Sequence, residues 1–223
     1  MKAESLPEQA TLEEAIALPL LPRTIAWAKI NSGTTNLDGL QTVAALLADS
    51  FSVLPGETRL VDPAPVEAVR ADGTVDQIQR GQHLMVSVRP EAAVRILLTG
   101  HMDTVFPADH AFQQITEVED GVLNGPGLAD MKGGISVMLG ALQLLEQSEY
   151  ASRIGYDVMI NSDEEVGSGS SASLIEQLAK GKTAALTYEP ALPDGTLAGE
   201  RGGSGNFSII FTGKSAHAGR NPD

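Results

Sequence analysis

Three short apolar segments, separated by stretches with helical spacing, constrain the fold of this chain more than any other feature. They comprise residues 94–99, 156–161 and 184–188. Between them, apolar residues recur at helical spacing from Ile135 to Leu145, and residues 171–180 form a second predicted helix. Nearly continuous apolar strands are typical of a sheet that is covered on both faces. The alternation predicts an α/β three-layer sandwich with a mostly parallel mixed sheet.

The flanking segments extend this prediction on the N-terminal side. Two helices and one strand are expected at residues 12–30, 37–51 and 83–88. The polar, proline-containing stretch from Pro55 to Gly81 predicts loops with one edge strand. From residue 199 the chain becomes glycine-rich around a predicted strand, Asn206–Thr212, which indicates the beginning of a different structural unit.

Composition restricts what such a fold can bind. The 223 residues are 42% hydrophobic and 20% charged, as in ordinary globular proteins. The net charge of -14 argues against the broad basic surface that a nucleic acid requires. Because the chain has no cysteine, any metal must be held by histidine, aspartate and glutamate.

The N-terminal residues are polar and acidic, without the apolar stretch of a secretory signal. No uninterrupted apolar run is long enough to cross a bilayer. We therefore expect a cytoplasmic protein without a membrane partner.

Metal-competent side chains follow the predicted strands. The strand at 94–99 leads into His101 and Asp103, whose spacing of two residues lets the carboxylate reach the imidazole. A histidine that binds a metal commonly donates its other ring N–H to a carboxylate. Taken alone, a histidine at a strand end is more often simply solvated.

Further acids occupy comparable turns. Asp130 stands in a glycine-rich segment before a helix, where the alternative role is a helix cap. Glu164 and Glu165 follow the strand at 156–161, where adjacent charges are tolerated if a cation neutralises them. A solvated acidic loop is the alternative for this pair. Glu189 follows the strand at 184–188 and indicates nothing by itself.

Together, one histidine and several carboxylates after successive strands suit zinc. A shared carboxylate can hold two zinc ions ~3.5–4 Å apart, and zinc lowers the pKa of bound water to about 7. An adjacent glutamate that does not bind the metal can pass the water's proton to a leaving amine. Candidate motifs for dinucleotide binding, phosphate binding and serine hydrolysis each lack a required glycine.

Five motifs occur in a fixed order along the chain: HMDTV (101–105), GPGLADMKGG (125–134), SDEEVGS (162–168), YEP (188–190) and SAHAG (215–219). The chain thereby resembles the zinc-dependent exopeptidase and deacylase family. That family includes glutamate carboxypeptidase, acetylornithine deacetylase, succinyl-diaminopimelate desuccinylase, aminoacylase and related dipeptidases. The glutamate carboxypeptidase branch is the most similar in character.

The resemblance implies a role for each position. Asp130 would bridge two zinc ions, with His101 and Glu189 completing one site and Glu165 binding the other ion. Glu164 would act as the general base.

Two further roles follow from the same resemblance. Asp103 would orient His101, and His217 would reach the active site of a neighbouring subunit and stabilise the oxyanion. The alternative for His217 is a polar residue beside a turn. Cobalt or manganese would suit the same ligands as zinc.

The resemblance also implies hydrolysis of an amide bond in a small peptide or an N-acyl amino acid by a homodimer. The family supplies one more zinc-binding histidine near its C-terminus, and neither His83 nor His110 lies where that ligand belongs. We therefore expect an N-terminal portion of a longer enzyme, in which residues 1–198 belong to the catalytic domain and 199–223 begin the dimerisation (lid) domain. An aminopeptidase or dipeptidase with the same centre, and a non-catalytic binding module, remain alternatives.

Overall fold

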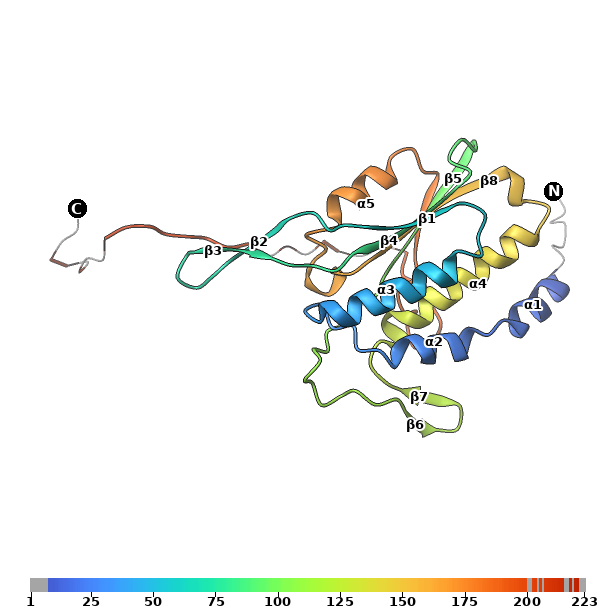
Figure 1. Cartoon of the computed structure of the whole chain (residues 1–223), viewed down its shortest axis with the longest axis horizontal. Coiled ribbons are helices and arrows are strands. Elements are labelled where there is room, and N and C mark those ends of the chain that lie inside the picture. Colours follow the sequence, from blue (N-terminus) through green and yellow to red (C-terminus); the bar gives the residue numbers. More distant parts are fainter. Residues whose placement is uncertain are drawn as a thin grey trace.

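The computed structural model of the protein describes residues 8–199, 202–203, 205, 207–214, 217 and 219–220. In this part of the chain, five strands form one mixed sheet in the order β1-β4-β8-β5-β9 (Figure 1). They span Glu57–Val61 (β1), His83–Val88 (β4), Val94–His101 (β5), Ile154–Asn161 (β8) and Ala184–Thr187 (β9). Strands β8, β5 and β9 run parallel to one another, whereas β4 and β1 are antiparallel to their neighbours.

Five α-helices in the described residues accompany this sheet. They span Glu8–Ala17 (α1), Leu20–Ala28 (α2), Leu37–Phe51 (α3), Gly134–Gln147 (α4) and Ala172–Ala179 (α5). Helix α3 contacts β1 and β4, α4 contacts β5, and α1 and α2 pack against α4. Figure 1 shows α5 on the opposite side of the sheet from α3 and α4. The predicted α/β sandwich with a mixed sheet is confirmed.

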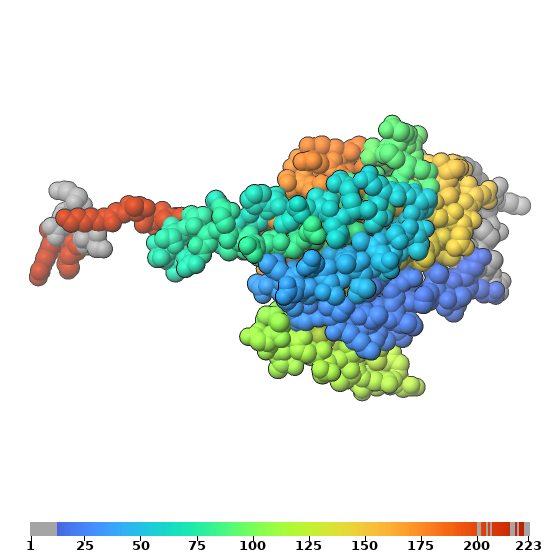
Figure 2. All heavy atoms as spheres, in the orientation of Figure 1, coloured from blue at the N-terminus to red at the C-terminus, as the bar shows by residue number. Residues whose placement is uncertain are grey.

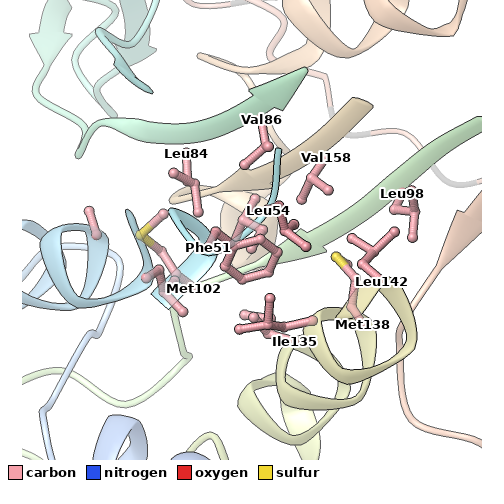
Figure 3. Close-up of a cluster of buried hydrophobic side chains, with 14 of the residues drawn as sticks. Phe51, Leu54, Leu84, Val86, Leu98, Met102, Ile135, Met138, Leu142 and Val158 are labelled. Atoms are coloured by element: carbon pink, nitrogen blue, oxygen red, sulfur yellow. The ribbon is translucent and has the colours of Figure 1, made fainter. Parts of the chain in front are cut away.

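The hydrophobic core lies between the sheet and the layer of α3 and α4. Leu84, Val86 and Val158 of the sheet gather around Phe51 of α3 and Met138 of α4 (Figure 3). All five side chains are completely buried. This packing holds in place the strands β5 and β8, which are followed by the turns that carry predicted site residues.

One helical stretch, Leu128–Gln147, has the 20 residues and the mean hydropathy of 1.2 that a membrane-spanning helix would need by length and composition. Within it, Ile135, Met138 and Leu142 are buried in the core just described. An apolar helix is also what a central core position requires. Core packing therefore accounts for the composition of this stretch.

The single helix predicted over residues 12–30 is wrong, since the structure has two helices there. α1 ends at Ala17, and α2 begins at Leu20 directly after Pro19. Proline lacks a backbone N–H and disfavours helical backbone in the residue before it. The break at Pro19 follows from these two properties.

Two hairpins outside the main sheet were not predicted. They consist of β2 (Val66–Val69) with β3 (Val75–Ile78), and β6 (Thr116–Glu119) with β7 (Val122–Asn124). None of their residues is fully buried, so they lack the apolar runs that identify core strands. The first hairpin turns through Asp72–Gly73, a pair that favours tight turns because glycine accepts the positive φ of 84°.

The strand predicted at Asn206–Thr212 is not formed by the residues that the structure describes. Asn206 lies outside them, and residues 207–212 have no strand pairing. Residues 208–211 instead run beside residues 69–73 of the β2–β3 hairpin, away from the sheet (Figures 1 and 2). An apolar sequence becomes a strand only where a neighbouring strand accepts its hydrogen bonds.

A buried ion pair fastens β9 to the sheet. Lys182 Nζ lies 2.6 Å from Asp157 Oδ2, and the two side chains are 4% and 5% exposed. Arg95 lies farther away, at 3.4 Å from the same oxygen. Burial raises the pKa of Asp157, but hydrogen bonds from Lys182, Ser87 and Arg95 outweigh burial, so the pKa is lowered overall. The stabilisation from this pair is therefore present at neutral pH and is lost as the pH falls below 3.8, the ordinary pKa of aspartate.

Lys182→Met is expected to lower the free energy of unfolding by about 2 kcal/mol, because Asp157 stays buried and keeps only the more distant Arg95 and the neutral Ser87 as partners. Lys180→Met is the matched control, since Lys180 is 70% exposed and pairs with Glu176 one helical turn away. Lys180→Met should lower the free energy of unfolding by less than about 0.5 kcal/mol. Urea denaturation at pH 7 measures both values, and equal losses for the two variants would contradict the assignment.

Candidate metal centre

The carboxyl ends of β5, β8 and β9 meet at one edge of the sheet, because these strands are parallel. His101, the last residue of β5, is directly paired with Asn161, the last residue of β8. Asp103, the Glu164–Glu165 pair and Glu189 follow these strands. Ligand sites in α/β sheets form at this edge.

His101 lies at the centre of the predicted site, and its side chain is 1% exposed. Its Nε2 atom lies 2.8 Å from Asp130 Oδ1, 3.6 Å from Glu189 Oε1 and 3.9 Å from Glu164 Oε2. Burial lowers the pKa of His101, but hydrogen bonds and charge from Asp103 and Glu189 outweigh burial and raise the pKa to about 11. The charges of Asp103 and Glu189 therefore favour a positive charge at His101.

Asp103 is completely buried behind the histidine. Its carboxylate accepts hydrogen bonds from the Thr34 hydroxyl and from the backbone amides of Glu164 and Glu165. His101 Nδ1 lies 3.1 Å from the backbone carbonyl of Asp103 and 3.4 Å from its Oδ1, so the second ring nitrogen faces both oxygens. This arrangement orients the ring with Nε2 toward the other acids.

The paired glutamates have raised pKa values. The pKa of Glu165 is raised to about 7: burial has the largest effect, and the charges of Asp130, Asp103 and Glu164 act in the same direction against the opposing effect of His101. Burial also raises the pKa of Glu164. Carboxyl groups with raised pKa values are suited to proton transfer near neutral pH.

Two overlapping groups of metal-competent atoms share His101. One consists of His101, Asp130 and Glu165, and the other of His101, Glu164 and Glu189, with all ligand atoms of a group within 4.8 Å of one another. All five residues are therefore brought together. The trio of His101, Asp130 and Glu189 that the resemblance implies is not itself one of the two groups, so this division of ligands stays a prediction.

The spacing and charge of the cluster fit divalent zinc. Two donors on one tetrahedral zinc, each at about 2.0–2.1 Å, would lie roughly 3.3 Å apart. The distances from His101 to Asp130 and to Glu189, 2.8 and 3.6 Å, bracket this value. Among the described residues, His101 is the only basic side chain within ion-pair distance of Asp130, Glu164 or Glu189. The excess negative charge calls for a cation.

A tight turn delivers Asp130 to this cluster. Gly127 has a left-handed φ of 68°, and Asp130 itself is non-helical with φ -115° and ψ 99°. A Cβ atom on Gly134 would lie 1.9 Å from the carbonyl oxygen of Tyr188, so only glycine lets α4 begin so close to the chain that carries Glu189. The N-cap of α4 is Gly133, so Asp130 is not the helix cap that the alternative reading proposed.

Asp163, the first acid of its run, has a different role from the two glutamates. It is completely buried and accepts hydrogen bonds from the backbone and hydroxyl of Ser170 and from the hydroxyl of Ser171, at 2.7–2.8 Å. His83 lies behind this network, where burial lowers its pKa. Asp163 thus holds the loop that carries the glutamates and needs no metal ion for its charge.

Three residues near the centre were missed in the sequence. Thr34 donates to Asp103, and Lys132 donates to Ser32, which lies in the same N-terminal segment as Thr34. Lys132 is 1% exposed, and burial lowers its pKa to about 8. The only local sequence feature that points to one of them is the position of Lys132, two residues after Asp130 in a glycine-rich turn.

The remaining histidines lie outside both ligand groups. His217 is exposed, and its Nδ1 accepts a hydrogen bond from the Gly219 amide at 3.1 Å. His110 lies in an exposed loop with its ring 5.1 Å from that of Phe106. The role of His217 at a neighbouring subunit stays a prediction.

An α/β sandwich with one histidine and several carboxylates at the carboxyl edge of its sheet defines a domain of the metallopeptidase class. Comparison with known families agrees with this class, because residues 97–209 match the model of peptidase family M20/M25/M40. The chain belongs to this family.

Two curated relatives share substantial sequence with the chain. Carboxypeptidase G2 from Pseudomonas sp. (strain RS-16) is 33% identical over 144 residues, which cover 64% of this chain and 35% of the relative. Succinyl-diaminopimelate desuccinylase from Maricaulis maris (strain MCS10) is 36% identical over 141 residues, covering 58% of this chain and 36% of the relative. The chain thus spans about a third of the length of these relatives.

Solved structures show the same fold at lower identity. Human carnosine dipeptidase 1 has a TM-score of 0.62 at 20% identity, with 82% of this chain and 40% of that chain covered. A family M20 metallo-carboxypeptidase from Sulfolobus solfataricus has a TM-score of 0.60 at 17% identity, with coverages of 80% and 39%. Both similarities confirm the α/β fold.

Proposed function

We propose that the full-length protein is a two-zinc hydrolase that cleaves an amide bond in a small peptide or an N-acyl amino acid. The observation that carries this proposal is the meeting of His101 with Asp130, Glu165, Glu164 and Glu189 in two ligand groups that share the histidine. Family membership supports the same class of reaction.

In this proposal, His101, Asp130 and Glu189 hold one zinc ion, and Asp130 and Glu165 contribute to the second. Bound zinc would polarise the scissile carbonyl and lower the pKa of water to about 7. Glu164 accepts the proton of the attacking water and transfers it to the leaving amine. Its raised pKa suits both steps.

Asp103 supports these residues from behind. Its carboxylate faces His101 Nδ1 and also accepts from the amides of Glu164 and Glu165, so it orients a ligand and the general base together. His217 would stabilise the oxyanion at the site of a second subunit. The proposal also assigns residues 1–198 to the catalytic domain and residues 199–223, which include His217, to the start of a dimerisation domain.

The names of the relatives guide the choice of substrates. One is a carboxypeptidase and the other a desuccinylase, which favours as substrate either a peptide that loses its C-terminal amino acid or an N-acyl amino acid that loses its acyl group. A panel of folyl-glutamate, succinyl-diaminopimelate, acetylornithine, acetyl-lysine and dipeptides separates these possibilities. Preference for a free amino terminus in the dipeptides would favour the aminopeptidase or dipeptidase alternative.

Metal analysis tests the proposed centre directly. The full-length protein is expected to bind two zinc ions per chain, to lose turnover of its best substrate when a chelator removes them, and to regain it when zinc is returned. Elemental analysis gives the metal content of each sample, and magnesium added in place of zinc serves as the control. A folded full-length protein that binds no divalent metal would favour a non-catalytic binding module.

A further inference from the structure

The N-terminal segment Ile30–Thr34 forms part of the wall of the metal centre. Gly33 is bridged to Thr104, the Thr34 amide donates to the Thr104 carbonyl at 3.2 Å, and the Thr104 amide donates to the Ser32 carbonyl at 3.0 Å. A Cβ atom on Gly33 would lie 2.4 Å from the carbonyl oxygen of Phe106, so the two backbones are in close contact. The segment therefore lies as a short parallel extension beside the residues that follow His101.

This pairing places the Thr34 hydroxyl against Asp103. The hydroxyl donates to Asp103 Oδ2 at 2.7 Å, and both residues are buried, with 6% and 0% exposure. The same carboxylate accepts from the amides of Glu164 and Glu165 at 3.2 and 3.3 Å and faces His101 Nδ1 at 3.4 Å. Thr34 is thus the side-chain hydroxyl that fixes the rotation of a carboxylate shared by a ligand and the glutamate pair.

A buried lysine ties the segment to the other side of the centre. Lys132 Nζ donates to the Ser32 hydroxyl at 2.7 Å and to the Ile30 carbonyl at 3.3 Å. The Ser32 hydroxyl in turn donates to the carbonyl of Met102 at 2.7 Å. Because Lys132 lies two residues after Asp130, these bonds connect the Asp130 turn to the segment that carries Thr34.

We propose that Thr34 is a positioning residue of the metal centre: through Asp103 its hydroxyl sets both the imidazole of His101 and the backbone of the Glu164–Glu165 pair. Lys132 and Ser32 hold Thr34 in place. This inference rests on the proposed function for its effect on metal binding, whereas its effect on the glutamate loop exists without metal. Without the hydroxyl, Asp103 loses its strongest donor and can rotate away from the histidine.

Thr34→Val in the full-length protein tests this inference, because valine has nearly the shape of threonine and replaces the hydroxyl with a methyl group that cannot donate. Zinc affinity, measured by competition with a chromophoric chelator, is expected to fall about tenfold, within the range for losing a residue that supports a metal ligand. kcat is expected to fall by a similar factor, with a smaller change in KM. Thr34→Ser, which keeps the hydroxyl, is expected to restore both to within about threefold of the parent.

Thr24→Val is the matched control. Thr24 is also 6% exposed, and its hydroxyl donates to the Leu20 carbonyl inside α2 at 2.9 Å and not to Asp103. This variant should keep the zinc affinity of the parent. Equal zinc affinity in Thr34→Val and the parent, no rescue by Thr34→Ser, or an equal loss in Thr24→Val would each overturn the inference. If Thr34→Val fails to fold, Thr34→Ala takes its place in the same comparison.

Hydrogen exchange provides a second test, which uses the metal-free protein. Hydrogen exchange of peptides that contain Glu164 and Glu165 is expected to be faster in metal-free Thr34→Val than in the metal-free parent, and unchanged in Thr24→Val. A parent that binds no zinc would contradict the proposed function but would leave this comparison intact. Unchanged exchange in Thr34→Val would overturn the positioning role itself.

Discussion

Replacing Glu164 with glutamine is expected to lower kcat by about 10²–10⁴-fold in the full-length protein, while the bound zinc is retained. The amide of glutamine has nearly the size of the carboxyl group but cannot accept the proton of the attacking water. Glu164 lies at the cluster, with Oε2 3.9 Å from His101 Nε2, and burial raises the pKa of its carboxyl group. Single-turnover kinetics and elemental analysis of the same samples measure the two effects.

Two other glutamates make this experiment specific. Glu176→Gln changes a surface residue that is 74% exposed and pairs with Lys180, so kcat should remain that of the parent. Glu165→Gln should lower metal content, because in the proposed centre Glu165 is a ligand of the second ion whereas Glu164 is the base. Loss of zinc from Glu164→Gln, in place of Glu165→Gln, would show that the ligand and the base are exchanged. Substantial activity in Glu164→Gln would contradict the role of a base altogether.

Gly134→Ala is expected to lower the free energy of unfolding by about 3 kcal/mol, because the new methyl group would collide with backbone that cannot move separately. The added Cβ would lie 1.9 Å from the carbonyl oxygen of Tyr188. Any relaxation has to separate the start of α4 from the chain after β9. That movement increases the distance between Asp130 and Glu189, so zinc affinity should fall with stability.

Gly140→Ala in the same helix provides the comparison for this effect. There the added Cβ would meet side-chain ends, Leu20 Cδ2 at 2.9 Å and Leu18 Cδ1 at 3.1 Å, which can move aside. Alanine also has a higher helix propensity than glycine, by about 1 kcal/mol, so the free energy of unfolding should change by less than about 1 kcal/mol in either direction. Thermal and urea unfolding compare the two variants, and equal stability for both would show that α4 does not depend on the contact with Tyr188.

The strands that follow from the sequence are those written as runs of mostly apolar residues. β4, β5 and β8 are such runs and carry buried residues in the structure. β9 was predicted from the same kind of run, although its residues are exposed at the edge of the sheet. The β2–β3 and β6–β7 hairpins were not predicted, because short half-exposed strands have little apolar signal. Pro19 interrupts the helix predicted over residues 12–30, so the helical sequence on either side of it forms two helices and not one.

The residues of the candidate site also fall into those that the sequence indicates and those that it does not. His101, Asp103, Asp130, the glutamate pair and Glu189 could be proposed from sequence because each follows a strand or precedes a helix in a recognisable motif. Their convergence in the structure agrees with that prediction.

The supporting residues could not be found in this way, since their roles depend on partners remote in the chain. Thr34 contacts a residue 69 positions away, and Ser32 contacts a residue 100 positions away. Asp163 likewise depends on partners outside its motif, because hydroxyl donors seven and eight residues later, on Ser170 and Ser171, satisfy its carboxylate.

The donors of the proposed centre differ in their access to water. His101 approaches from the interior, with 1% of its side chain exposed, whereas Asp130, Glu164 and Glu189 are 56%, 47% and 30% exposed. In the part of the protein described by the structure, the acidic side is therefore the side on which a bound ion would meet solvent, and the negative field there would accelerate its arrival. Exchange of isotopically labelled zinc should consequently proceed at a rate governed by ligand release, and far faster than global unfolding.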